Sequence, residues 1–66
     1  MDTKEYEELK AKFLALVANV PLKLRDEIIA LIDDKPVSWN VAYGEVKFDS
    51  NASKKIIERM RQIGVL

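Results

Sequence analysis

The side chains of this chain that could take part in chemistry are carboxylates and amines, because its 66 residues include neither cysteine nor histidine. Without these two side chains, nucleophilic catalysis of the Ser-His-Asp or Cys-His type is excluded. Disulfide bonds and metal sites built from Cys or His are excluded for the same reason. No Ser-x-x-Lys motif offers another activated nucleophile. We therefore expect a protein that is not an enzyme.

The clustered carboxylates are Asp26-Glu27 and Asp33-Asp34. Both pairs lack the loop spacing of a calcium site, and charge runs on helices usually face water, so we favour a solvated surface over a metal site. Glycine occurs only at positions 44 and 64, which is too few for a phosphate-binding loop or a dinucleotide fingerprint. We expect no metal and no cofactor.

Basic side chains gather in the second half of the chain. Residues 35–66 carry six bases and three acids, whereas residues 1–34 carry five bases and eight acids. An anion or a nucleic acid could be contacted by a set of five basic residues. These are Lys47, Lys54, Lys55, Arg59 and Arg61. A net charge of zero and a pI near 6.2 argue against nucleic acid, because non-specific binding depends on neutralising phosphates.

An internal ion pair is the alternative explanation of this basic cluster. Asp33 and Asp34 are expected at the end of one helix, and Lys54 and Lys55 at the start of another, so each cluster opposes its helix dipole. We predict that one of these acids lies within ion-pair distance of one of these lysines. Such a pair would be exposed and worth about 1 kcal/mol or less.

The segment between these clusters, Val37 to Phe48, is predicted to be a β-hairpin. Its apolar residues alternate with small or polar ones as far as Tyr43, and Gly44-Glu45 suits a two-residue turn. The rival interpretation is a helix with Trp39, Ala42, Tyr43 and Val46 on one stripe. We favour the hairpin, because the helix places a glycine in its middle and leaves Val41 and Phe48 outside the stripe.

Three helices are predicted around this hairpin. The first covers Thr3 to Ala18, the second runs from Leu22 to Asp34, and the third begins after Ser50 or Asn51 and closes at Gly64. The fold class is then α+β: a small single domain with the order α-α-β-β-α and helices packed on one face of a two-stranded antiparallel hairpin. The alternative is an all-α four-helix bundle in which Trp39 to Phe48 is helical.

The chain lacks catalytic and cofactor-binding motifs but has enough large apolar residues to form a core. These two observations lead to a functional hypothesis. We expect a non-catalytic interaction module, acting as a small adaptor or as a homo-oligomer, in the cytoplasm and without a membrane segment. The alternative is a nucleic-acid-binding protein or transcription regulator that uses the basic C-terminal helix. The lack of Cys and His, with abundant Ile, Glu and Lys, is also compatible with a thermophilic source.

Self-association is predicted at the edge of the first hairpin strand, which carries no charged residue. The strand would pair with its symmetry mate, giving a homodimer with a four-stranded sheet. The residues of this candidate edge are Val37, Ser38, Asn40 and Ala42. Cover of the edge by the first helix or by Val65-Leu66 is the alternative.

Overall fold

A computed structural model describes residues 2–66. Its first helix, α1, covers Thr3–Ala18 as predicted. The Asp2 side chain caps the helix by accepting a hydrogen bond of 2.7 Å from the backbone N–H of Glu5, which satisfies one free donor of the first turn. The apolar stripe of α1 faces inward and buries Tyr6, Phe13 and Val17.

The segment after α1 is not the helix predicted for Leu22 to Asp34. A single 3-10 turn, η1 (Leu22–Leu24), leads into β1 (Ile28–Ile32), which pairs antiparallel with β2 (Lys35–Ser38). Short apolar runs suit either a helix or a buried strand, and here β-branched isoleucines and the residues that follow favour the strand. Asp33 and Asp34 both take the left-handed conformation, with φ of 53° and 66°, as a tight hairpin turn requires.

The hairpin predicted for Val37 to Phe48 is therefore wrong. Only Val37 and Ser38 belong to a strand, and the chain continues as a helix, α2 (Trp39–Lys47). The Ser38 side chain caps α2 by accepting a hydrogen bond from the N–H of Val41. Burial of Ala42 and Val46, both 0% exposed, outweighs the cost of about 1 kcal/mol for a glycine inside the helix. The all-α alternative was right about this segment and wrong about the bundle.

The last helix, α3, covers Ser53–Gln62 and starts slightly later than predicted. Its inward side buries Ile56, Ile57 and Met60. Gly64 follows with a φ of 85°, the left-handed conformation that ends many helices. The turn between α2 and α3 contains Asp49, which also has a positive φ of 51°.

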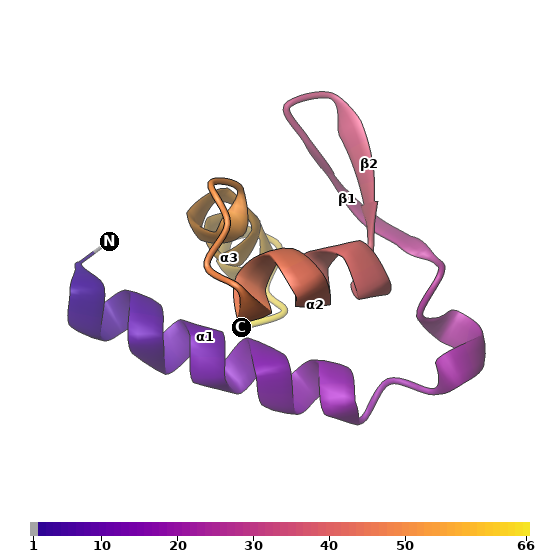
Figure 1. The fold of residues 1–66 in the computed structure, drawn as a ribbon, viewed down its shortest axis with the longest axis horizontal. Helices are drawn as coiled ribbons and strands as arrows, with labels where there is room; N and C mark the ends of the chain where they lie inside the picture. Colours follow the sequence, from indigo (N-terminus) through magenta and orange to yellow (C-terminus); the bar gives the residue numbers. More distant parts are fainter. Residues whose placement is uncertain (1) are drawn as a thin grey trace.

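Figure 1 shows how these elements are arranged. Helix α2 runs back antiparallel to α1, α3 lies behind α2 and is seen nearly end-on, and the hairpin projects away from α1. Strand β2 lies against α2, and β1 lies nearer α3. The α+β class, with three helices and one antiparallel hairpin, is confirmed. The observed order is α1, η1, β1, β2, α2 and α3. When η1 is counted as a helix, the predicted order α-α-β-β-α holds as far as α2, and α3 comes after it.

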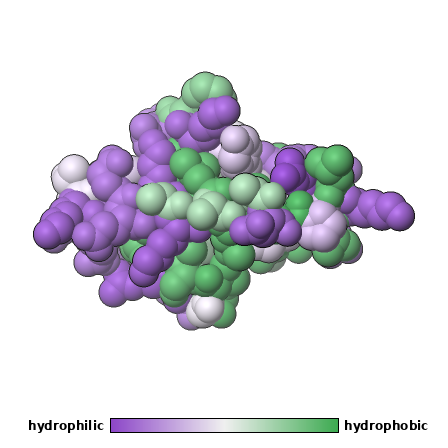
Figure 2. Space-filling view, turned by 90° about the horizontal axis from the view of Figure 1, so that it is seen from below, coloured by the Kyte–Doolittle hydropathy of each residue, from purple (hydrophilic) through white to green (hydrophobic). Residues whose placement is uncertain are grey.

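Figure 2 views the molecule from the side of α1. Hydrophilic side chains cover the end where α1 begins, and hydrophobic surface gathers in the middle of this face. Near the C-terminus, Ile63 and Val65 are exposed hydrophobic residues. None of the helices in residues 2–66 has the length and apolar character needed to cross a membrane.

Candidate functional site

A cleft of about 450 Å³ lies between the start of α1 and the turn that precedes α3. The Tyr6 hydroxyl donates a hydrogen bond of 2.7 Å to Oδ1 of Asp49 and also bonds the hydroxyl of Ser53. From α1, Lys10 places its Nζ 2.9 Å from both carboxylate oxygens of Asp49. These four side chains therefore form one connected polar cluster.

The hydrogen bonds and burial of this cluster shift the pKa values of three of its members. Burial raises the pKa of Tyr6 above its ordinary value of 10.0, and its bond to Asp49 acts in the same direction, so Tyr6 stays protonated at neutral pH. The hydrogen bonds from Lys10 and then from Tyr6 lower the pKa of Asp49. The bond to Asp49 raises the pKa of Lys10. These shifts favour neutral Tyr6, charged Lys10 and charged Asp49, and we interpret the cluster as a clamp that fixes the α2–α3 turn to α1.

The predicted ion pair between the acidic and basic clusters is confirmed. Nζ of Lys55 lies 2.6 Å from Oδ2 of Asp33, and the two side chains are 58% and 66% exposed. The pair forms because the tip of the hairpin approaches α3. The hairpin predicted between the two clusters, at Val37 to Phe48, is absent, and α2 covers most of that segment.

The remaining basic candidates do not form one free patch. Arg61 is paired with Glu5 of α1, and Arg59 contacts Gln62 on its own helix. The amine of Lys54 lies over the ring of Tyr6 at 5.7 Å from the ring centre. Lys47 belongs to α2 and lies over the rings of its neighbours Tyr43 and Phe48. Within residues 2–66, Lys47, Lys54 and Arg59 have no carboxylate partner.

The predicted self-association edge does not exist as a strand edge. Val37 and Ser38 lie in β2 and are buried, whereas Asn40 and Ala42 lie in α2. Ala42 is 0% exposed and points into the core instead of outward. The assignment failed because a period of two in a short segment was given more weight than the helical stripe through the same residues.

A groove of about 320 Å³ lies between the hairpin and the two C-terminal helices. Apolar side chains from β1, β2, α2 and α3 form most of its lining, and charged side chains form the rest. The apolar residues are Ile32, Pro36, Val37, Val41, Ala52 and Ile56, and the charged residues are Asp33, Lys35 and Glu45. Apolar walls with a few polar groups are typical of binding sites, so this groove is the best candidate site in the described chain.

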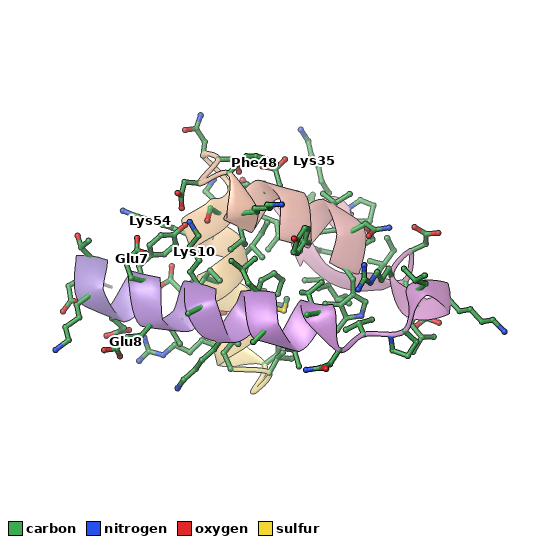
Figure 3. All side chains as sticks on the ribbon, turned by 60° about the horizontal axis from the view of Figure 1, so that its bottom comes forward. Glu7, Glu8, Lys10, Lys35, Phe48 and Lys54 are labelled. Atoms are coloured by element: carbon green, nitrogen blue, oxygen red, sulfur yellow. The ribbon has the colours of Figure 1, made fainter. Side chains whose placement is uncertain are left out.

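Two large apolar residues are exposed on α2 and at its end: Val41, which lines the groove, and Phe48, the C-cap of the helix. Val41 is 50% exposed and Phe48 is 77% exposed. Figure 3 shows Phe48 and Lys35 projecting on the side of the molecule that faces away from α1. The sequence did not lead us to predict this exposed surface. It did contain an indication, because Val41 and Phe48 are the two residues that lie outside the apolar stripe of the helical alternative.

Carboxylates do not converge into a metal site within residues 2–66, where no group of three or more potential acidic ligands was found. By fold and site, the protein belongs to the class of small α+β domains with an apolar surface groove. No protein-family model matches the chain, and comparisons with curated proteins and with solved structures give no match either.

Proposed function

We propose that this protein is a non-catalytic interaction module that binds a protein segment in the groove between the hairpin and helices α2 and α3. The observation that carries the proposal is the groove itself, whose lining is largely apolar and includes the half-exposed Val41. Exposed apolar surface that forms a groove rimmed by polar residues is typical of interaction sites.

The chemistry of the groove indicates what would bind. A volume of about 320 Å³ accommodates one or two large apolar side chains of a partner. Asp33, Lys35 and Glu45 line the same groove and carry charges of both signs, so a strongly charged partner is not selected. The partner segment is therefore expected to have an apolar or aromatic anchor flanked by polar residues.

Selection from a displayed library of random peptides tests this proposal. Peptides that share an apolar or aromatic anchor should be recovered. A Val41→Lys substitution places a charge in the groove wall at a half-exposed position, so the fold should persist while peptide affinity falls at least about tenfold. The affinities can be measured by fluorescence anisotropy.

The matched control is Ala11→Lys, which adds the same charge at an exposed position of α1. This helix contributes no residue to the lining of the groove. This variant should bind the selected peptides as the wild type does. Recovery of peptides without a common anchor, or equal binding by the Val41→Lys variant, would contradict the proposal.

Nucleic-acid binding is the second candidate function, and one observation favours it. Helices α2 and α3 are joined by a short turn, and the exposed side of α3 carries Lys54 and Arg59 without carboxylate partners in the described chain. A basic second helix after a short turn is how many proteins enter the major groove of DNA. Against it, Asp33 and its neighbour Asp34 lie at the hairpin turn, near Lys55 of α3, where they would repel phosphates.

A titration with labelled duplex and single-stranded DNA at low and moderate salt separates the two functions. For an interaction module of zero net charge, we expect no binding in the micromolar range at moderate salt. Micromolar binding that weakens steeply with salt and is lost in an Arg59→Ala variant would favour the second candidate instead.

A further inference from the structure

Gly44 stands in the middle of α2 without a structural reason inside the chain. Its φ is not positive, and a Cβ added at this position would meet no atom within 4 Å. A glycine inside a helix costs about 0.5–1 kcal/mol relative to alanine, because it loses more conformational freedom on folding. Neither the backbone conformation nor the packing of this chain explains that cost.

Two exposed apolar residues flank Gly44 on the same side of the helix. Positions 41, 44 and 48 lie three and four residues apart, which places them on one face. We call Val41, Gly44 and Phe48 the α2 stripe. The glycine forms a notch between two projecting side chains, and such a notch allows the backbone of another helix to approach closely.

The charges beside the α2 stripe are complementary to those of a second copy. At 100° per residue, Glu45 and Lys47 fall on opposite sides of the stripe. The Ser50 hydroxyl binds one carboxylate oxygen of Glu45, and the other oxygen has no partner within residues 2–66. A twofold axis that runs roughly along α2, with each helix inclined slightly to it, would therefore bring Glu45 of each copy to the side of Lys47 of the other. Zero net charge adds no overall repulsion between copies.

We infer that the α2 stripe packs against the same stripe of a second copy of this chain, forming a twofold dimer with Gly44 at the crossing point. This inference rests on the proposed function as an interaction module and names one partner for the surface beside the groove. The contact surface of one short helix is small, so the dimer is weak and forms at high protein concentration.

A Gly44→Lys substitution tests the inference without disturbing the monomer. The new side chain enters open space, and lysine favours helix more than glycine does, so the thermal midpoint should stay equal or rise. Sedimentation equilibrium should show a concentration-dependent dimer for the wild type. In the variant, the dissociation constant should increase at least about tenfold, because the notch is filled.

Ala11→Lys serves again as the control, since it makes the same change of charge on α1 and should leave the dimer intact. A wild type that stays monomeric up to its solubility limit would overturn the inference, and so would a Gly44→Lys variant that associates like the wild type. Binding of the selected peptides by such a monomer would leave the proposed function standing, so the two failures are distinguishable.

Exchange of the flanking charges tests the arrangement of the two copies. Glu45→Lys and Lys47→Glu should each weaken the dimer, because each brings like charges together. The double substitution restores opposite charges and should recover the affinity of the wild type. Two weakened single variants without recovery in the double variant would overturn the twofold pairing.

Discussion

Tyr6 shows how a single side chain can join three parts of this small fold. Tyr6 is buried on the inward face of α1. Its hydroxyl bonds both Asp49 in the α2–α3 turn and Ser53 at the start of α3. Asp49 holds a left-handed conformation that is uncommon for a residue other than glycine. The hydrogen bonds from Tyr6 and Lys10 hold the side chain of Asp49 in place and so stabilise the turn.

We predict that Tyr6→Phe destabilises the protein by about 1–3 kcal/mol, because the buried Ser53 hydroxyl loses its partner. Urea denaturation monitored by circular dichroism measures this change. Tyr43→Phe is the matched control: the Tyr43 hydroxyl makes no hydrogen bond within residues 2–66, and its loss should change stability by no more than about 0.5 kcal/mol. Equal destabilisation by both substitutions would show that the Tyr6 hydroxyl has no special role.

At the scale of the elements, the positions of one helix and the hairpin are the reverse of the prediction. The hairpin lies in the segment predicted to be the second helix, and α2 lies in the segment predicted to be the hairpin. The residues from Ile28 to Ile32 fit a helical stripe, and those from Val37 to Tyr43 fit a strand, so local pattern favoured the wrong structure twice. Turn and cap residues decide between them: Asp33-Asp34 closes the hairpin, and Ser38 caps the helix that follows. These polar residues are short-range signals, and we gave them too little weight.

The contact between Lys55 and Asp33 was predicted correctly from a fold whose topology was partly wrong. The sequence located two charge clusters with opposite signs and predicted their pairing correctly. The route of the chain between them was predicted wrongly, yet the hairpin tip still reaches α3. A correct contact therefore does not prove the topology from which it was predicted.

At the scale of the whole molecule, stability should fall at both extremes of pH. The pKa of Asp49 is lower in the folded state than its ordinary value of 3.8, so its stabilising effect is complete above that value and is lost as the pH falls through the folded pKa. The pKa values of Tyr6 and Lys10 are raised above 10.0 and 10.5, so their effects are complete below those values and are lost at higher pH.

The urea midpoint measured across the pH range checks this prediction. We expect little contribution from this cluster to the pH dependence between about pH 5 and 9, with losses on both sides. Asp49→Asn removes the carboxylate, so the acid loss should become shallower than in the wild type. An unchanged acid limb in this variant would show that other carboxylates control the acid stability.

The sequence by itself determined the bounds of α1, the presence of α3 with its closing glycine, and the α+β class. These features depend on side-chain period and on capping groups within a few residues, which are local. The same composition led us to expect a non-catalytic interaction module, and that expectation remains a proposal.

Only the tertiary structure decided which of two short apolar segments became the hairpin. It also decided that Ala42 is core while Val41 and Phe48 are exposed, and it brought Pro36, Val41 and Ala52 together around one groove. The physical reason is that a short apolar segment can bury one face as a strand or as a helix, and the choice depends on the surface that the rest of the chain offers to it.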